Sequence, residues 1–421
     1  MLVAGIPTFS SSDQSQESRL LDYRLPLASM CVLFFFIGFI TVLNDVLIPH
    51  LKEMFSLNYT QAMLIQFCFF SAYFIVSVPA GLLVHKVGYK SSMIFGLLTT
   101  ALGCGLFYPA ASLHVYGLFL LALFVLASGL TILQVSVNPY VAALGPERLA
   151  SSRLILAQAL NSFGTTIGPF FAGMMLLSVS GIAAGSEAVK TQYLMLAGVL
   201  ILASFIVKKL KLPEIHESSH TVEVNDGRTI WQAKQTLFGA CAIFFYVGAE
   251  VGIGSFLINY FELHHIGNMS AASAAHFVGY YWGGAMIGRF IGAVVTRVVK
   301  PQLALMFNGS MAILLLCVSM NTSGYLAMGS ILAVGLFNSI MFPTIFSLAI
   351  KGLERHTSRG SGLVCLAIVG GAVMPLVQGA VADITDVQAS FIIPALSYLV
   401  IIGFAMSAPR LTEKWRQLKV N

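Results

Sequence analysis

Apolar residues occur in long runs that short polar stretches separate, and this pattern decides the class of fold. Residues 25–48, 62–84 and 115–132 are clear examples. Each run approaches the roughly 20 residues that an α-helix needs to cross about 30 Å of hydrocarbon. Only 10% of the residues are charged, whereas a typical soluble domain carries about 25%. The sequence therefore predicts an all-α integral membrane protein rather than a water-soluble fold.

Twelve such runs are predicted to be membrane-spanning helices. They cover residues 26–48, 62–84, 91–109, 115–140, 153–178, 191–207, 235–259, 273–295, 303–320, 324–348, 361–382 and 390–407. The first run follows a polar leader, has no small-residue cleavage site and is longer than the core of a signal peptide, so we interpret it as the first spanning helix. An even number of spans places both ends of the chain on the same side of the membrane.

The basic residues indicate which side this is. Of the 23 Lys and Arg, only Lys52 and Lys190 fall in loops that follow odd-numbered helices. By the positive-inside rule, both termini and the central loop are predicted to be cytoplasmic. The same asymmetry explains the net charge of +6 without a nucleic-acid partner. We expect a plasma membrane protein, in bacteria one of the inner membrane, that contacts lipid and works as a monomer.

The six cysteines predict neither a disulfide framework nor a metal site. They all lie inside apolar runs, and no two have the spacing of metal ligands. Buried free cysteines of this kind behave as small packing residues. We therefore expect no metal and no cofactor apart from a coupling ion.

A polar stretch divides the predicted spans into two sets of six. The predicted segments are a leader at 1–24, an N-terminal half at 25–207, a cytoplasmic linker at 208–234, a C-terminal half at 235–408 and a tail at 409–421.

The two halves share a weak internal repeat. Gln134 and Asn338 each precede a proline by five residues, Pro139 and Pro343, and a Gly-x-Glu-Arg motif follows in both halves. Halves with the same topology imply a twofold pseudo-axis along the membrane normal. Repeats of this parallel kind place a substrate site between the halves near the bilayer midplane.

Several motifs resemble one transporter family. Residues 81–90, GLLVHKVGYK, resemble the loop pattern G-x-x-x-D-R-x-G-R-R/K of the major facilitator superfamily, with His85 in place of the usual Asp. More specific are the pair Asn44-Asp45, the segment 134–140 and the segments 246–251 and 282–290. Together these motifs resemble the fucose–galactose–glucose/proton symporter branch. The resemblance implies the twelve-helix major facilitator fold and sugar uptake by alternating access, driven by an ion gradient.

One position within that resemblance bears on the sugar. Fucose symporters have a Glu at the position that matches Gln134, whereas the amide of this chain cannot ionise. The resemblance therefore implies a neutral hexose of the glucose or galactose type. Fucose and an N-acetylhexosamine remain alternatives at this stage.

Two carboxylates are candidates for ion coupling, since charged groups at membrane depth are costly and are functional-site hypotheses by default. Thr41, Asn44 and Asp45 fall on one face of the first span. There Asp45 could bind the coupling proton or hold Na⁺; alternatively, it caps a kink near Pro49. Glu250 lies among glycines of the seventh span, where it could bind sugar hydroxyls, couple to the ion or pair internally.

Neutral polar side chains at membrane depth suggest a sugar site. A sugar hydroxyl is both donor and acceptor, and side-chain amides match it without burying a net charge. Amide glue between helices is the alternative. For Trp282 the alternatives are stacking on a pyranose ring and ordinary packing. The predicted substrate-binding residues are Asn44, Gln134, Asn138, Gln158, Asn161, Glu250, Trp282, Asn338 and Gln378.

Basic residues near the predicted cytoplasmic ends are assigned to gating or structure. They are His85, Lys86, Arg148, Arg289 and Arg355. For Arg289 the open alternatives are a structural ion pair, a lipid-facing anchor and a substrate contact. An enzyme is not expected, since no HExxH motif, no GxSxG motif and no cluster of His and Asp lies at membrane depth. A sugar sensor built like a transporter is the alternative from another functional class.

Overall fold

A computed structural model describes residues 23–55, 59–177, 182–213 and 229–417. Within these ranges, the side chains of residues 44–54, 59–64, 66, 169–177, 182–189, 271, 272 and 275 are outside the described part. Every regular element of the described residues is helical.

The N-terminal half contains five long helices. They are α2 (Arg24–Met54), α3 (Tyr59–Leu113), α4 (Tyr116–Ala143), α5 (Ala150–Leu177) and α6 (Ile182–Lys209). Helix α3 carries two of the predicted spans, and its backbone is non-helical at Gly88, where φ is 80°. Only glycine adopts this conformation without steric cost, so the chain reverses there. The loop that we predicted between residues 84 and 91 is therefore a single glycine break.

The C-terminal half begins with three uninterrupted helices and ends with three broken ones. The uninterrupted helices are α7 (Lys234–Glu262), α8 (Ala271–Val295) and α9 (Pro301–Asn321). The broken spans consist of α10 (Gly324–Asn338) with α11 (Met341–Ala349), α12 (Thr357–Leu366) with α13 (Gly370–Ile384), and α14 (Val387–Ser390) with α15 (Ile392–Gln417).

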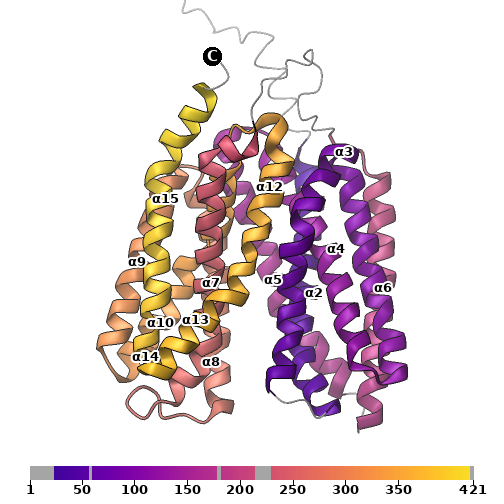
Figure 1. Ribbon diagram of the computed structural model, residues 1–421, viewed down its shortest axis with the longest axis vertical. Coiled ribbons are helices and arrows are strands. Elements are labelled where there is room, and N and C mark those ends of the chain that lie inside the picture. Colours follow the sequence, from indigo (N-terminus) through magenta and orange to yellow (C-terminus); the bar gives the residue numbers. More distant parts are fainter. Residues whose placement is uncertain (1–22, 56–58, 178–181, 214–228, 418–421) are drawn as a thin grey trace, which may run out of the picture.

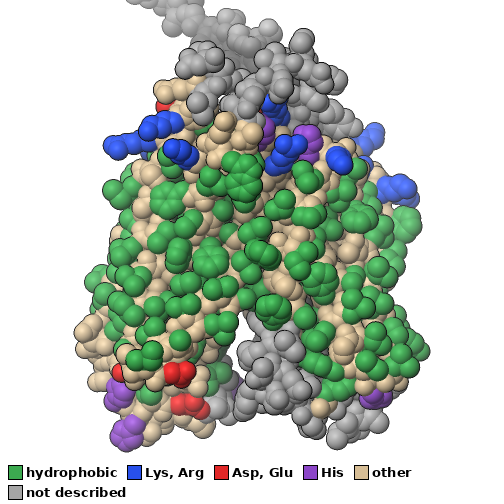
Figure 2. All heavy atoms as spheres, in the orientation of Figure 1, with side chains coloured by type: hydrophobic (Ala, Val, Ile, Leu, Met, Phe, Trp, Pro, Cys, Tyr) green, Lys and Arg blue, Asp and Glu red, His purple; other side chains and the backbone are tan. Residues whose placement is uncertain are grey.

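The element order confirms the predicted fold class. Nine stretches of the described residues are long and apolar enough to cross a membrane, and one of them, Phe67–Leu113, has 47 residues and contains the break at Gly88. With α3 taken as two spans and each broken helix as one, the helices follow the twelve predicted spans in order. Figure 2 shows a broad apolar band, with Lys and Arg gathered at the end of the molecule where the C-terminus lies.

We call this end, where α4, α6 and α8 finish, the terminal end. The two halves contact each other there (Figure 1), chiefly through α5 against α8 and α11, and through α12 against α3 and α4. The hydroxyls of Ser151 and Ser347 lie 2.5 Å apart across this interface. Helix backbones also approach closely, since a Cβ on Gly362 would lie 2.6 Å from the Ser77 carbonyl oxygen. The halves are therefore closed against each other at the terminal end.

Candidate substrate and coupling site

Five of the predicted polar residues lie at intermediate depth in the bundle. With a rise of 1.5 Å per residue, they lie about 12 to 24 Å along their helices from the terminal end. This depth is near the middle of a spanning helix. The residues concerned are Gln134 on α4, Gln158 and Asn161 on α5, Glu250 on α7 and Asn338 on α10.

Asn338 is the centre of a sealed hydrogen-bond network in the C-terminal half. Its side-chain nitrogen donates to the Tyr281 hydroxyl at 2.7 Å, and its side-chain oxygen accepts from the Tyr398 hydroxyl at 2.5 Å. Asn338, Tyr281 and Tyr398 are all fully buried. The amide thereby connects α10 with α8 and α15. In this conformation Asn338 serves as interhelical glue, the alternative that the sequence left open.

Gln134, the repeat partner of Asn338, has a simpler and more accessible arrangement. Its side-chain nitrogen donates to the Tyr73 hydroxyl on α3 at 2.8 Å, and Gln134 itself is only half-buried. The sequence repeat thus extends to a pair of tyrosines, because Tyr73 and Tyr281 each lie on the second span of their half. Sequence reasoning missed both tyrosines; a comparison of the second spans with each other could have found them.

The two repeat prolines each leave one backbone carbonyl without its helical donor. A proline has no N–H to offer the carbonyl four residues earlier, so Pro139 frees Val135 and Pro343 frees Ser339. The Val135 oxygen accepts from the Ser361 hydroxyl of the other half at 2.8 Å. The Ser339 oxygen accepts from Nε of Arg289 at 3.2 Å. Both prolines therefore create acceptors for side chains from other helices.

Glu250 and Arg289 form a buried ion pair. An Nη2 to Oε1 distance of 3.4 Å joins them, and their side chains are 14% and 10% exposed. The Tyr246 hydroxyl lies within hydrogen-bonding reach of Glu250 and donates to the Asn338 carbonyl at 3.3 Å. Nη1 of Arg289 donates to the Ser162 hydroxyl on α5, in the other half. The structure thus selects the ion pair for Arg289 over a lipid-facing anchor.

The two amides of α5 have different surroundings. The side-chain nitrogen of Asn161 donates to the Phe34 carbonyl on α2 at 3.1 Å. At this crossing a Cβ on Gly38 would lie 2.0 Å from the Asn161 carbonyl oxygen, so α2 and α5 are in close contact. The side chain of Gln158 has no hydrogen-bond partner among the described residues, although it is largely buried. Of the two, Gln158 is therefore the amide with free hydrogen-bonding capacity.

Asn138 and Gln378 both take part in helix packing. The Asn138 amide donates to the Gln134 carbonyl at 2.9 Å, and its side chain lies against Cys365 of the other half. The buried side chain of Gln378 donates to the Ser390 hydroxyl at 3.4 Å. A Cβ on Gly252 would lie only 2.4 Å from Oε1 of Gln378. The Gln378 side chain therefore packs α13 closely against α7.

Trp282 lies on α8, one helical turn from a residue that contacts α5. Met286, one turn nearer to the terminal end, contacts the Thr166 hydroxyl of α5 at 3.7 Å. Trp282 is 40% exposed, and its ring packs edge-on against Tyr281 with centroids 5.2 Å apart. The structure thus shows packing of Trp282 against Tyr281 and leaves part of the indole exposed, and its stacking on a sugar stays a prediction.

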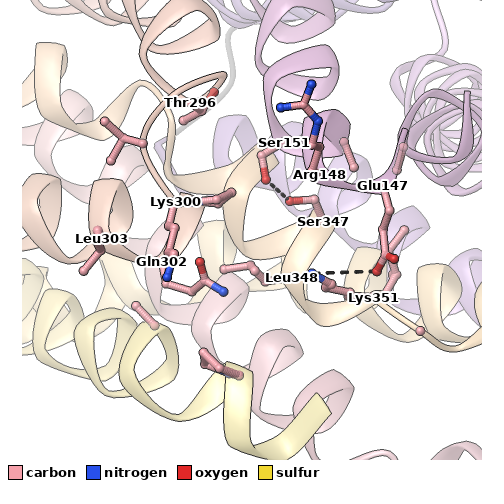
Figure 3. Close-up of a pocket in the computed structure, with 18 of the residues that line it drawn as sticks. Glu147, Arg148, Ser151, Thr296, Lys300, Gln302, Leu303, Ser347, Leu348 and Lys351 are labelled. Carbon is pink, nitrogen blue, oxygen red and sulfur yellow. Dashed lines mark hydrogen bonds and ion pairs between the residues drawn. The ribbon is translucent and has the colours of Figure 1, made fainter. Parts of the chain in front are cut away.

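The predicted gating residues lie at the terminal end. His85 and Lys86 are exposed beside the break at Gly88, and Arg355 is half-buried. Arg148 lines a cavity of about 1240 Å³ between the halves (Figure 3).

The closest ionic contacts across that cavity involve a residue that we did not predict. Glu147 lies 3.7 Å from Nζ of Lys351 and 3.3 Å from Nη2 of Arg416, both in the other half. The Gly-x-Glu-Arg motif directed attention to this position, but we assigned the role to its arginine. The structure assigns the ionic contact between the halves to the glutamate.

Asn44 and Asp45 cannot be placed in the same way. The backbone of α2 passes through both residues, but their side chains lie outside the described residues. Their predicted contributions to substrate binding and coupling therefore stay predictions.

Known proteins resemble this chain along nearly its whole length. Residues 30–368 match the model of the Major Facilitator Superfamily. A glucose/galactose transporter of Brucella abortus is 50% identical over 408 residues, which cover 96% of this chain and 99% of that protein. The L-fucose-proton symporter of Escherichia coli is 33% identical over an alignment that covers 94% of this chain and 98% of that protein. A crystal structure of the transporter FucP in the outward conformation has a TM-score of 0.85 at 33% identity, covering 92% of this chain and 99% of that one.

Proposed function

Because the chain belongs to the Major Facilitator Superfamily, we propose that it is a secondary active transporter that carries a neutral hexose of the glucose or galactose type together with a proton. The relative named as a glucose/galactose transporter, at 50% identity, supports the sugar. The relative named as a fucose-proton symporter supports the proton. The chain is a sugar transporter and not an enzyme.

The observation that carries this proposal is the chemistry that lies between the halves. Neutral amides and phenols surround the one buried ion pair of the described residues, Glu250 with Arg289. Hydroxyl groups of a sugar find both donors and acceptors in such a set without meeting an uncompensated charge. The neutral pair of Gln134 and Tyr73 offers a site in the N-terminal half, and Trp282 offers an apolar face in the C-terminal half.

We propose a cycle in which the sugar and the proton bind from the end opposite the terminal end. Asp45 and Glu250 are the coupling carboxylates, and protonation removes a buried negative charge before the loaded protein opens toward the terminal end. Gln134, Gln158 and Trp282 contact the sugar. Rocking of residues 25–207 against residues 235–408 exposes the site alternately to the two sides.

We place the terminal end in the cytoplasm and the protein, as a monomer, in the bacterial inner membrane. Nineteen of the 23 Lys and Arg lie in the leader, the tail or loops that follow even-numbered spans, as the positive-inside rule requires of cytoplasmic segments. Labelling of single cysteines in intact cells with an impermeant thiol reagent tests this orientation. Fast labelling of a cysteine placed at Arg148 would contradict it.

The experiment that tests the function is uptake into proteoliposomes. Labelled glucose, galactose, fucose and N-acetylglucosamine are supplied separately, with a pH gradient or a sodium gradient imposed alone. We expect accumulation of glucose and galactose with the pH gradient. Accumulation with the sodium gradient alone would replace the proton by Na⁺ as coupling ion. Binding of a hexose without accumulation or counterflow would identify a sugar sensor and refute transport.

A further inference from the structure

Arg289 is bonded to both halves of the protein at once. Its Nε donates to the Ser339 carbonyl and its Nη2 lies against Glu250, both within the C-terminal half. Its Nη1 donates to the Ser162 hydroxyl on α5 of the N-terminal half. Among the described residues this is the only hydrogen bond between Arg289 and the other half. The position of the guanidinium therefore depends on whether α5 and α8 are in contact.

We propose that Ser162 is a positioning residue for proton coupling, because it holds Arg289 across the interface so that the charge of Glu250 decides whether the terminal end stays closed. This inference rests on the proposed function. It adds a residue, Ser162, and the direction in which protonation of Glu250 shifts the balance between the closed and open states. Ser162 belongs to neither polar set that the sequence indicated, since a serine on an apolar helix most often bonds to its own backbone. It does so here as well, to the Gln158 carbonyl at 3.2 Å.

The direction follows from the cost of burying a charge. While Glu250 is ionised, Arg289 has its counter-ion, and closing the halves around the pair buries no net charge. When Glu250 takes up a proton, the guanidinium is left between the halves with only neutral acceptors. Burial of an unpaired charge is costly, so this state favours separation of α5 from α8, which admits water. Arg289 lies six residues before the end of α8, about 9 Å from the terminal end.

Other ionisable groups near Glu250 do not change this reasoning. They are Arg289 on α8 and the phenols of Tyr246 on α7, Tyr281 on α8 and Tyr398 on α15. Phenols are neutral at ordinary pH, so Arg289 is the charged partner. Helix α13, which also packs against α7, contributes the neutral Gln378 beside Gly252. Protonation of Glu250 therefore changes the net charge of the cluster from zero to positive.

The conformational test uses a reporter pair at the terminal end. Cysteines replace Ser151 and Ser347, whose hydroxyls lie 2.5 Å apart in the closed state, and alanine replaces the exposed Cys241 and Cys317. The yield of the disulfide then reports closure. In this background we expect the yield to fall from alkaline to mildly acidic pH. An unpaired buried donor shifts an equilibrium by roughly five- to 160-fold, so Ser162→Ala should lower the ratio of closed to open protein by this factor at alkaline pH.

Ser361→Ala is the matched control. It removes a buried serine hydroxyl that also bonds across the interface, to Val135, but does not touch Arg289. We expect the control to lower the yield by a similar factor at every pH and to keep the pH dependence. In Ser162→Ala the ion pair is disconnected from the interface, so the pH dependence should shrink several-fold. Equal pH dependence in the two variants would overturn the proposal.

Transport separates this inference from the proposed function. We expect Ser162→Ala to lose proton-driven accumulation of hexose while it keeps counterflow exchange, and Ser361→Ala to keep both. Ser162→Thr retains the hydroxyl and should retain accumulation; equal loss in the threonine and alanine variants contradicts the role of the hydroxyl. If the unmodified protein accumulates hexose and Ser162→Ala does so equally well, only the inference fails. If the unmodified protein accumulates no hexose with a proton gradient, the proposed function fails and the inference fails with it.

Discussion

Replacement of Asn338 by alanine distinguishes a structural amide from a sugar ligand. The change removes the acceptor of the Tyr398 hydroxyl and the donor to the Tyr281 hydroxyl, both fully buried, and leaves Tyr281 only its bond to the Glu250 carbonyl at 3.4 Å. A buried donor or acceptor that loses its partner costs about 1–3 kcal/mol, so two phenols predict a loss of roughly 2–6 kcal/mol. This is a large part of the stability of most proteins, which is about 5–15 kcal/mol. We therefore expect Asn338→Ala to denature at a clearly lower temperature than the unmodified protein.

The assay is thermal denaturation of the purified protein in detergent, followed by tryptophan fluorescence or by loss of the monodisperse fraction. Asn308→Ala is the matched control, because the Asn308 amide donates only to the carbonyl of Ala304, on its own helix, at 2.8 Å. We expect the control to change the denaturation temperature little. Hexose binding is then measured below the transition. If Asn338→Ala is as stable as the control and binds hexose many times more weakly, Asn338 is a sugar ligand and the structural interpretation is wrong.

Three further substitutions test the remaining assignments. Gln134→Ala should weaken hexose binding by roughly tenfold, the effect of about one hydrogen bond, with little change in stability; unaltered affinity would leave the amide as packing. Asp45→Asn should abolish uphill accumulation and keep counterflow, and normal accumulation would remove Asp45 from coupling. Glu147→Gln removes two exposed ion pairs worth about 0.2–1 kcal/mol each, so closure at the terminal end, measured by cysteine accessibility, should weaken by roughly two- to 30-fold. Glu413→Gln is the control and should leave closure unchanged. Glu413 is exposed at the same end, and among the described residues it forms no ion pair between the halves.

The spans and the repeat were accessible to sequence reasoning because both depend on local patterns. Apolar runs of helical length identified the spans, and the predicted number of twelve spans is confirmed. The glycine break in α3 and the split of the tenth span next to Pro343 were not anticipated. A run of apolar residues does not distinguish a continuous helix from a broken one. The positions of Gln134 and Asn338 before their prolines were visible in the sequence, and they led to the polar centre of each half.

The partners of these residues were not accessible in the same way. Tyr73, Tyr281 and Tyr398 are ordinary members of apolar helices until the fold directs their hydroxyls at an amide. Ser162 and Ser361 gain their importance only because the other half lies against them. Contacts between helices far apart in the sequence depend on the rotation of each helix about its axis, and a single sequence, read by itself, contains little information about that rotation.

The two halves of the repeat have diverged in chemistry. In the N-terminal half, Pro139 frees a carbonyl that meets a neutral serine, and Gln134 stays half-buried with one tyrosine. In the C-terminal half, Pro343 frees a carbonyl that meets Arg289, and Asn338 is sealed between two tyrosines. A charge next to the sugar site would cost desolvation energy in every cycle, whereas a charge held in a rigid network across the interface can respond to a proton. The repeat thus has a neutral amide in one half and an ion pair in the other, and the bond of Arg289 to Ser162 is one of the contacts that join the two halves.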